Sequence, residues 1–513
     1  MNKIKTITSN IVSENILKIK ELFPNCVIET KDKNENTTLK IDFETLKQEL
    51  SDDVIKNNEK YEFTWPGKSK SILLANQPTD KILVPCKEES VNWDTTQNLY
   101  IEGDNLEVLK ILRSTYFHKV KLIYIDPPYN TGKNRLYKDK HTHTDWLNMM
   151  YPRLKLARDF LADNGVIFIS IDDHEVHNLK KICDDIFGEE NFILQFIWEK
   201  TQHFGRQKIN YYSNCEYILC YTTKLFIGGR LNELLIEYTK TNFMDAPLYN
   251  ASNKTNKILF PKKSVKFNIE DGKYQNSNNN KFQLLNTVIV KNQTNINDFI
   301  INFKSRWSQK KIFEEYEKGT RYLIKSSDFS VRAIYANDKT FNESPKQIIF
   351  TNINNNLVAK NKHGRKVGTT EEGTSILKKL KLDYFKYPKP VSIINYLISL
   401  LSDKDNIILD FFSGSATTAH AVMQLNAEDG GNRKFIMVQL PEPCNEKSEA
   451  FKAGYKNICE IGKERIRRAG KKIIEETGKT DLDVGFRVLK LDSSNMKETH
   501  YWPEEYNSSV LAR

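Results

Sequence analysis

Two short stretches of the sequence carry residue types that can do chemistry. In the first, the apolar run KLIYI is followed by Asp126, Pro127, Pro128 and Tyr129. The prolines fix φ, remove two amide donors and keep the preceding residues extended, so the Asp126 carboxylate and the Pro127 carbonyl project outward as acceptors only. Two acceptors beside an aromatic ring suit a planar group with an NH2, such as a nucleobase that bears an exocyclic amine.

This arrangement predicts that the amine attacks an electrophile. Hydrogen bonds from both amine hydrogens to Asp126 and to the Pro127 carbonyl favour a more tetrahedral nitrogen, whose lone pair is then free to attack a group such as a sulfonium methyl. Because the attacking amine is neutral, positioning and electrostatic stabilisation matter more than a strong base. In a duplex the base would have to flip out, at a cost of about a few kcal/mol, and stack on Tyr129. The structural alternative is a rigid turn at a strand end.

The second stretch consists of Asp410, Phe411, Phe412, Ser413, Gly414 and Ser415. It follows the strand-like run NIIL and leads into a helical pattern, and Gly414 lets the backbone turn tightly and approach a ligand closely. Open parallel sheets bind ligands beyond the carboxyl ends of their strands, where both stretches are expected to lie. Taken alone, a glycine turn of this kind is also compatible with a simple connection.

Strand and helix patterns alternate around both stretches. Strands are expected in LYIE, VKLIYI, VIFISI, NIILD and KFIMVQ, and helices in NLEVLKILRSTY, in 145–161 and in 417–425. Two further strand-like runs, FILQFIW and CEYILCY, complete the first half. This alternation predicts an α/β protein with an open, mostly parallel sheet.

The sheet pattern is lost in the middle of the chain, from about 231 to 356. The segment FKSRWSQKKIFEEYEKG interleaves Trp307 with Lys and Arg, which suits phosphate contact and stacking, although an ordinary amphipathic helix that buries Trp307 explains the pattern equally well. The predicted organisation is given by four ranges: an N-terminal appendage at 1–90, a catalytic half at 91–235, a target-recognition insertion at 236–356, and a second half with a C-terminal helix at 357–513.

The composition limits the function classes. Among 513 residues, 77 Lys and Arg against 66 Asp and Glu give a net charge of +11, which favours a polyanionic partner such as nucleic acid. A general richness in Lys and Asn produces the same charge without such a partner. The 7 cysteines are odd in number and scattered, which predicts reduced thiols and a cytoplasmic protein. Without a signal peptide or a run of about 18 apolar residues, no membrane association is expected.

The two stretches in this order, with Asp-Pro-Pro-Tyr before the glycine loop, resemble the β class of amino-group DNA methyltransferases. The wider sequence is similar to the modification subunits of type III restriction-modification systems in YEFTWPGK, NLYIEGDNLEVLK, PKPVSIINYL, FIMVQLPEP and GYKNICEIGKERIRRAG. The resemblance extends from about 61 to 495, except for the insertion. It implies a Rossmann-like class I methyltransferase fold, S-adenosylmethionine as cofactor, and methylation of the N6 amine of adenine in a specific DNA sequence.

The resemblance also implies roles for individual residues. The catalytic motif would be Asp126, Pro127, Pro128 and Tyr129, and the cofactor loop Asp410, Phe411, Phe412, Ser413, Gly414 and Ser415. Around the cofactor would lie Lys389 and Pro390 at its methionine end, Asp104 and Asn105 near its adenine, and Gln439 near its ribose, with Glu442 as a substitute for the usual acid. The family's usual second glycine is replaced by Ala416 in this chain.

The family further implies partners, namely double-stranded DNA, a second copy in a homodimer, and an ATP-dependent restriction subunit. Family chains commonly extend beyond the position of Arg513, so elements that help dimerisation are expected to be reduced. The alternatives are methylation of the N4 amine of cytosine, because the same loop grips either base, an RNA substrate, and a DNA-recognition subunit without activity.

Two other motifs are interpreted as structural. DDHEVH contains possible metal ligands, but His174 and His177 are three residues apart rather than four, so no metal is expected and Asp172 and Asp173 are predicted to cap the next helix. The basic run KERIRRAGKK is predicted to be the solvated face of a helix, with a smaller chance of touching phosphate.

Overall fold

The computed structural model describes residues 11–31, 37–51, 61–132, 139–202, 213–223, 236–239, 245–334, 340–351, 358–361, 363–385, 387–401 and 403–493. The chain divides into two units, each treated by itself below. The first unit comprises Met1–Leu234 and Pro345–Arg513, and the second comprises Leu235–Ser344.

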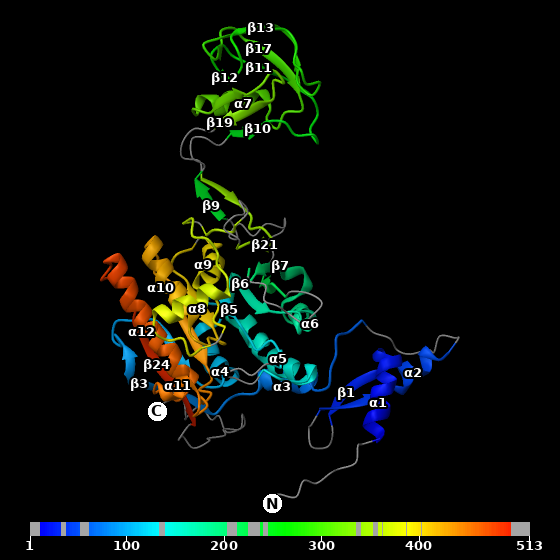
Figure 1. Cartoon of the computed structure of the whole chain (residues 1–513), viewed down its shortest axis with the longest axis vertical. Helices are drawn as coiled ribbons and strands as arrows, with labels where there is room; N and C mark the ends of the chain where they lie inside the picture. The colour runs from blue at the N-terminus through cyan, green and yellow to red at the C-terminus, as the bar shows by residue number, and fades with distance from the viewer. Residues whose placement is uncertain are drawn as a thin grey trace, which may run out of the picture. The chain divides into compact units, whose positions relative to one another are not determined.

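A ten-stranded sheet forms the centre of the first unit (Figure 1). Its strand order is β21-β7-β8-β6-β5-β22-β23-β4-β24-β3. From β6 to β24 the neighbouring strands are parallel, and β21 also pairs parallel with β7, whereas the pairs β7–β8, β8–β6 and β24–β3 are antiparallel. The strands are β21 (Ile348–Ile349), β7 (Phe192–Glu199), β8 (Cys215–Thr222), β6 (Leu161–Ile171), β5 (Val120–Ile125), β22 (Ile407–Asp410), β23 (Lys434–Gln439), β4 (Leu99–Glu102), β24 (Phe486–Ser493) and β3 (Lys81–Val91). The predicted mostly parallel α/β fold is therefore confirmed.

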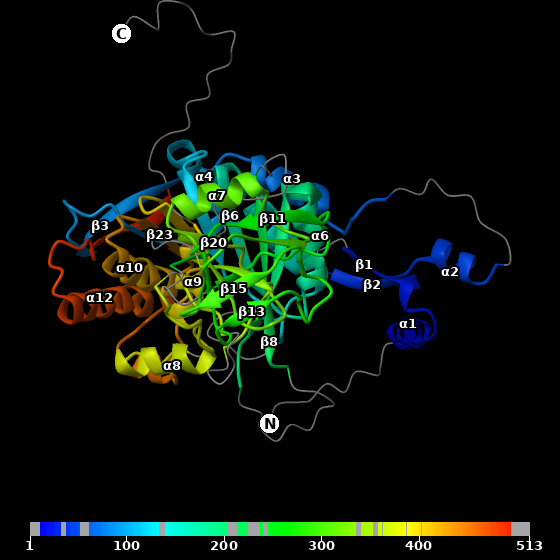
Figure 2. The same ribbon diagram turned by 90° about the horizontal axis from the view of Figure 1, so that it is seen from above.

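Helices cover both faces of this sheet. Strand β5 is buried at every residue, as expected for a parallel strand with helices on both faces. One group of mutually packed helices contains α3 (Lys68–Asn76), α4 (Asn105–Tyr116), α5 (His143–Phe160) and α6 (Val176–Phe187). A second group contains α9 (Val391–Ser399), α10 (Thr417–Asp429) and α12 (Ile458–Thr477). Figure 2 shows α10 and α12 on one side of the sheet and α3 and α6 on the other.

The core explains why the helices form where the apolar periodicity predicts them. In α5, the side chains at Trp146, Met150, Leu154 and Ala157 are fully buried at helical spacing, and they share one apolar cluster with α4, α6 and the sheet. The helix starts after Thr142, whose hydroxyl accepts a hydrogen bond from the amide of the third residue along. The remaining helices of the first unit are α1 (Ile11–Leu22), α2 (Phe43–Glu49), α8 (Thr370–Lys379) and α11 (Glu449–Lys452).

The chain leaves two adjacent central strands in opposite directions. From β5 it passes through α5 to β6 on one side, and from β22 it passes through α10 to β23 on the other. At such a switch point the loops diverge and leave a crevice beyond the carboxyl ends of the strands, which is the usual ligand site of open α/β sheets. The two stretches singled out in the sequence therefore border the same crevice.

The second unit is built almost entirely of short strands around a core of its own. A seven-stranded sheet has the order β10-β19-β18-β12-β16-β15-β13, and a smaller sheet the order β11-β17-β14. The strands are β10 (Asp245–Pro247), β11 (Asn256–Phe260), β12 (Val265–Phe267), β13 (Gly272–Tyr274), β14 (Gln283–Leu284), β15 (Val288–Lys291), β16 (Thr294–Asn295), β17 (Phe299–Phe303), β18 (Arg321–Ile324) and β19 (Val331–Ile334). A two-stranded ribbon, β9 (Ile236–Thr239) with β20 (Thr340–Glu343), joins the ends of the unit.

The structure decides between the two interpretations of Trp307. Its side chain is only 8% exposed and belongs to the core of the second unit, and α7 (Gln309–Glu317) begins two residues later. The helix buries Ile312 against the same core. The interpretation as a packed amphipathic segment is correct, and Trp307 is not available for stacking on a base.

The sheet extends beyond two of the predicted segment boundaries. Strand β3 was assigned to the N-terminal appendage of 1–90, but it pairs along most of its length with β24 in the large sheet. Likewise, β21 lies within the predicted insertion of 236–356, yet it pairs with β7. Both strands lie at the two edges of the sheet, and neither has the continuous burial of the central strand β5. The N-terminal hairpin, β1 (Val27–Lys31) with β2 (Thr37–Ile41), contacts α5 through an ion pair between Lys31 and Asp145.

Among the residues that the structure describes, no helix has the length and apolar character needed to span a bilayer.

Candidate active site

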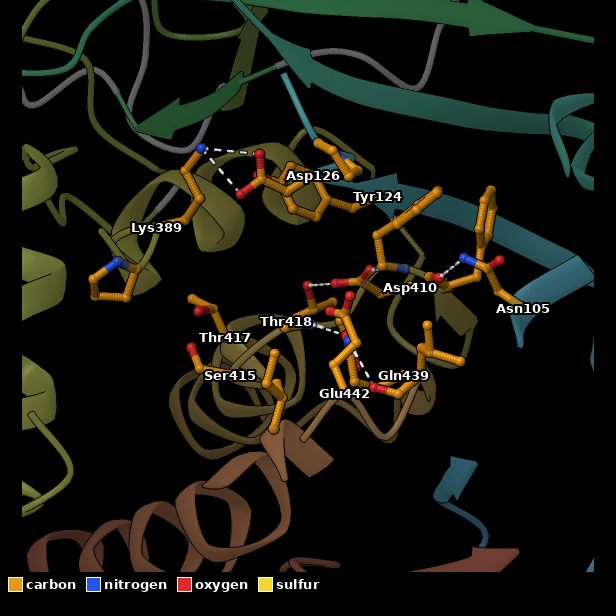
Figure 3. A pocket seen from close by; sticks show the side chains of 18 of the residues that line it. Asn105, Tyr124, Asp126, Lys389, Asp410, Ser415, Thr417, Thr418, Gln439 and Glu442 are labelled. Atoms are coloured by element: carbon orange, nitrogen blue, oxygen red, sulfur yellow. Dashed lines mark hydrogen bonds and ion pairs between the residues drawn. The ribbon is translucent and has the colours of Figure 1, made fainter. Parts of the chain in front are cut away.

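A pocket opens at the switch point between β5 and β22 (Figure 3). Twelve of the fifteen predicted site residues line it, and they are Asp104, Asn105, Asp126, Pro128, Lys389, Asp410, Phe411, Phe412, Ser413, Gly414, Ser415 and Gln439. Pro127, Tyr129 and Pro390 do not line the pocket. The structure therefore brings together residues that lie far apart in the sequence, from both halves of the large sheet.

The Asp-Pro-Pro-Tyr segment forms the end of the pocket beyond β5. The indole Nε1 of Trp146 donates a hydrogen bond of 2.7 Å to the Pro128 carbonyl, so α5 holds this loop in place. Tyr129 was expected to stack on a base, but its side chain is only 4% exposed. Its hydroxyl donates to Glu216 Oε2 at 3.1 Å and accepts from Lys389. The ring is thus packed into the protein in this structure.

The carboxylate of Asp126 is hydrogen-bonded to a buried lysine, Lys389. Lys389 Nζ donates to both carboxylate oxygens at 3.0 Å each and to the Tyr129 hydroxyl at 2.8 Å, as Figure 3 shows for the carboxylate. It also forms an ion pair of 3.2 Å with Glu216, which in turn lies 3.4 Å from Lys200. The cluster therefore alternates cations and carboxylates, and Glu216, on β8, is only 8% exposed.

The charged groups of this cluster stabilise one another in their ionised forms. Burial alone would lower the pKa of Lys389, but Asp126 and Glu216 outweigh burial and raise this pKa above its ordinary value. Burial would likewise raise the pKa of Glu216, but Lys389 and Lys200 outweigh it and lower this pKa. Lys389 and Glu216 are thus both ionised at neutral pH.

The loop after β22 forms the other side of the pocket. Asp410 is fixed by two hydrogen bonds, one from the Phe412 amide at 3.0 Å and one from the Thr418 hydroxyl at 2.6 Å. Burial raises the pKa of Asp410 to about 7, against the opposing effect of these two hydrogen bonds, and the charge of Asp126 adds to the rise. This carboxylate therefore changes its charge near neutral pH.

The loop turns through left-handed backbone at Gly414 and again at Ala416, with φ of 50° and 61°. Position 416 is where the family's usual second glycine is replaced, and the conformation shows why glycine suits it. A left-handed conformation costs a residue with a Cβ about 1–2 kcal/mol. The Gly414 amide donates to Gln439 Oε1 at 2.7 Å, so the Gln439 side chain holds the loop.

The far end of the pocket is formed by the start of α4. Asp104 caps this helix by accepting from the Leu106 amide at 2.8 Å, and it forms an ion pair of 3.0 Å with Arg153. The Asn105 side chain donates to the Phe411 carbonyl at 2.7 Å, which ties α4 to the loop after β22. Figure 3 shows Asn105 at the opposite end of the pocket from Lys389 and Asp126.

Several residues of the site were missed by sequence reasoning. Glu442, which the resemblance offers as a substitute for the ribose acid, also lines the pocket, and the lining residues that were not expected are Tyr124, His141, Met149, Arg153, Phe385, Tyr387, Pro388, Ile394, Thr417, Thr418, Leu440 and Ile458. Thr417 and Thr418 lie two and three residues after Ser415, the end of the predicted loop, so a slightly wider window would have included them. Glu216 had one signal, an acid inside the otherwise apolar run CEYILCY, but nothing in the sequence connects it to Lys389.

Two structural interpretations of motifs need correction. Helix α6 begins at Val176 with Glu175 as its N-cap residue, so Asp172 and Asp173 do not cap it. Asp172 instead accepts from the amide and ring of His174, and Asp173 from the Tyr217 hydroxyl. Within the described residues, no group of acids, histidines and cysteines has the arrangement of a metal site.

The basic run of α12 is not a solvated face at two of its positions. Lys463 and Arg465 are 3% and 0% exposed, although Lys471 farther along points to solvent. Lys463 is neutralised by contacts with Glu89 and Glu102. The charge pattern alone could not predict the burial of Lys463, because the acids that pair with it lie on β3 and β4, far away in the sequence.

The fold and the site together define a Rossmann-like enzyme of the methyltransferase class. A family model described as a DNA methylase, N6_N4_Mtase, matches residues 120–469. The StyLTI Mod subunit of a type III restriction-modification enzyme from Salmonella typhimurium is 32% identical over 83% of this chain and 65% of its own length. The EcoP15I Mod subunit from Escherichia coli is 31% identical over 85% of this chain and 72% of its own length.

The chain belongs to the DNA methylase family of the type III modification subunits, which confirms the resemblance inferred from its motifs. It spans 65% of the length of the Salmonella relative. A crystal structure of an M1.HpyAVI-SAM complex covers 72% of this chain and 98% of its own, at 13% identity and a TM-score of 0.31. Sequence, rather than this distant structural match, therefore carries the assignment.

The Lys389 cluster can be tested by Lys389→Met. The change leaves the buried carboxylate of Glu216 without its closest cation, so the free energy of unfolding should fall by about 3–5 kcal/mol at pH 8. At pH 5 the loss should be smaller, because without Lys389 burial dominates, the pKa of Glu216 rises above its unfolded value, and the protonated form is tolerated. Urea unfolding followed by tryptophan fluorescence at both pH values measures the effect.

Two further variants control this experiment. Lys200→Met removes the more distant cation and should cost clearly less than Lys389→Met. The double variant Lys389→Met with Glu216→Gln should recover part of the loss, because the unpaired charge is gone. An equal loss at pH 8 and pH 5, with no recovery in the double variant, would contradict the ionised cluster.

Proposed function

We propose that this chain transfers a methyl group from S-adenosylmethionine to the N6 amine of adenine in a specific sequence of double-stranded DNA, as the modification subunit of a type III restriction-modification system. One observation carries the proposal. The acceptor loop at Asp126 and the glycine loop at 410–415 line one and the same pocket. Family membership supports the reaction class. The acceptor loop would hold the target amine, and the glycine loop would hold the methyl donor.

The donor set of the pocket fits the cofactor. S-adenosylmethionine has a cationic sulfonium, a carboxylate and an aromatic base, and it supplies an electrophilic methyl group when bound. Carboxylates at Asp126 and Asp410 suit a cation, the hydroxyls of Ser415 and Thr417 suit a carboxylate, and the ring of Phe412 suits a base. We assign the cofactor to Asp104, Asn105, Lys389, Pro390, Asp410–Ser415 and Gln439, and the catalytic role to Asp126–Tyr129.

Asp126 performs the central step in this mechanism. Its carboxylate accepts one hydrogen of the target amine, and the Pro127 carbonyl accepts the other, so the nitrogen becomes more tetrahedral and its lone pair is free to attack. S-adenosylmethionine, held by the residues assigned above, would supply the methyl group and leave as S-adenosylhomocysteine, and the amine proton would pass to Asp126 and then to water. Since Lys389 donates to both oxygens of Asp126, the amine has to take over one of these positions. Positioning and charge supply most of the rate enhancement.

The remaining assignments concern partners and location. We propose that the second unit, within the predicted insertion of 236–356, recognises the target sequence, and that the base flips out of the duplex to reach Asp126. We further propose a homodimer and association with an ATP-dependent restriction subunit, because the resemblance to type III modification subunits implies both. A cytoplasmic location agrees with the seven cysteines, all of which are free.

Asp126→Asn tests the catalytic assignment. The substitution removes the negative charge that stabilises the forming cation, so methyl transfer should fall by at least about 100-fold, while the affinity for S-adenosylhomocysteine stays unchanged. Transfer of a tritiated methyl group to DNA measures the rate, and digestion of the product to nucleosides identifies the methylated base. Asp185→Asn, which alters a carboxylate bonded to Tyr151 outside the pocket, is the matched control. Full activity of Asp126→Asn, or N4-methylcytosine as product, would refute the proposal in its present form.

Asp410 should make cofactor affinity depend on pH. Its folded pKa of about 7 means that the carboxylate is mostly protonated at pH 6 and mostly ionised at pH 7.5. An ionised Asp410 attracts the sulfonium cation, so S-adenosylmethionine should bind severalfold more tightly at pH 7.5 than at pH 6. Isothermal titration calorimetry at a series of pH values measures this. In Asp410→Asn the affinity should be lower and nearly flat with pH. A persisting slope would contradict the assignment of the titration to Asp410.

Removal of the second unit tests its proposed role. Because Ile236 pairs with Glu343 in the β9–β20 ribbon, residues 236–343 can be replaced by a short turn without stretching the chain. The shortened protein should bind S-adenosylhomocysteine as tightly as the full chain and should lose methylation of the specific sequence. Calorimetry and labelled methyl transfer to DNA check the two expectations. Retained sequence-specific methylation would contradict a recognition role for the second unit.

A further inference from the structure

Helix α12 lies directly against the loop at 410–415. A Cβ atom at Gly462 would be 2.6 Å from the Tyr100 hydroxyl and 3.3 Å from the Gly414 carbonyl oxygen. A side chain at this position would displace the Tyr100 hydroxyl and crowd the loop, so glycine allows the helix to lie this close. One turn further along the same helix, Arg465 faces the same loop.

Arg465 is a buried cation with few partners. Its side chain is fully buried, and its Nη1 donates to Ser415 Oγ at 2.8 Å and to Thr417 Oγ1 at 2.6 Å. The Nε and Nη2 atoms have no hydrogen-bond partner in the part of the chain that the structure describes. No carboxylate forms an ion pair with Arg465 there either, whereas the other fully buried guanidinium, that of Arg433, is paired with Asp429 through both outer nitrogens.

The surroundings of Arg465 leave its charge uncompensated. Burial lowers the pKa of Arg465 to about 9, and no neighbouring acid opposes the effect. The nearby His420 is kept neutral, because burial and then the charge of Arg465 lower its pKa. A buried charge without a counter-ion is expensive, so its retention suggests that the counter-ion arrives with a ligand.

The two hydroxyls connect Arg465 to the pocket. Ser415 and Thr417 both line the pocket, and Figure 3 shows them side by side on one flank. Each hydroxyl oxygen accepts from the guanidinium, so its own hydrogen points elsewhere, toward an acceptor. Thr417 is also the first residue of α10, and Ala416 at the N-cap has no side chain that could satisfy the open amides of that helix. All of these donors favour an anion at the same place.

We infer that Arg465 is a positioning residue for the methionine carboxylate of the cofactor, and that it acts through the hydroxyls of Ser415 and Thr417. The inference rests on the proposed function and adds to it a residue outside the pocket lining. Arg465 polarises the two hydroxyls, holds them with their hydrogens toward the ligand, and supplies the positive charge that the carboxylate neutralises.

A comparison of two ligands on the full chain tests this role. S-adenosylhomocysteine carries the carboxylate, whereas its decarboxylated analogue retains the adenosine, the sulfur and the amine. In Arg465→Met, calorimetry should show S-adenosylhomocysteine weakened by about 10- to 100-fold and the analogue changed by less than about threefold. Arg465→Lys should recover part of the preference for the carboxylate. An equal weakening of both ligands would show a merely structural role and overturn the inference.

Two more variants keep the test decisive. Arg468→Met, on the same helix but bonded to Glu464 and to the carbonyls of Leu380 and Lys381, should leave both affinities unchanged. Thr417→Val removes one of the two hydroxyls with almost no change of shape, and it should reduce the ratio of the two affinities even if Arg465→Met does not fold. An unchanged ratio in Thr417→Val overturns the inference. If the unmodified chain binds neither ligand, the proposed function itself fails.

Discussion

The ammonium group of Lys389 is the interaction on which the rest of the site depends. It joins Asp126 after β5, Glu216 on β8 and the entry to α9, and 263 residues separate Lys389 from Asp126. A buried carboxylate such as that of Glu216 is tolerable only when a cation is fixed beside it. Since the second unit lies between the two partners in sequence, the contact also requires the chain to return to the same sheet after the insertion.

The parallel sheet explains why two acids lie in one pocket. Leu122 and Ile408 are partners in the pairing of β5 with β22, so both strands end at the same edge and deliver Asp126 and Asp410 there. Lys389 compensates the charge of Asp126, whereas Asp410 has only hydrogen bonds and titrates near neutral pH. The two carboxylates thus have different surroundings: Asp126 is paired with a buried ammonium group, whereas the charge of Asp410 responds to what binds beside it.

The sequence was sufficient wherever a function is encoded locally. Asp126 and Asp410 both end apolar strands, and the rule that ligands bind beyond parallel strands places them together without any coordinates. Sequence reasoning failed where the meaning of a residue depends on its partners. Glu216 is only an acid inside an apolar strand until its partner Lys389, from a distant segment, is known. Arg465 is predicted to be a solvated charge on a helix, because the hydroxyls that it contacts and the close packing at Gly462 also involve distant segments. The burial of the Tyr129 ring has the same origin, since the partners of its hydroxyl, Glu216 and Lys389, come from distant segments.

The strain at Ala416 fits this distribution of charge. Left-handed backbone at a residue with a Cβ costs about 1–2 kcal/mol, and serine, threonine or aspartate would be the usual choice at a helix N-cap. Any of these side chains would accept from the free amides of α10 and occupy the donors beside Ser415 and Thr417. Alanine leaves those donors open, just as Arg465 has no carboxylate counter-ion among the residues that the structure describes. The pocket thus combines anionic carboxylates at Asp126 and Asp410 with unused donors at the start of α10, an arrangement complementary to a ligand that carries both a cation and a carboxylate.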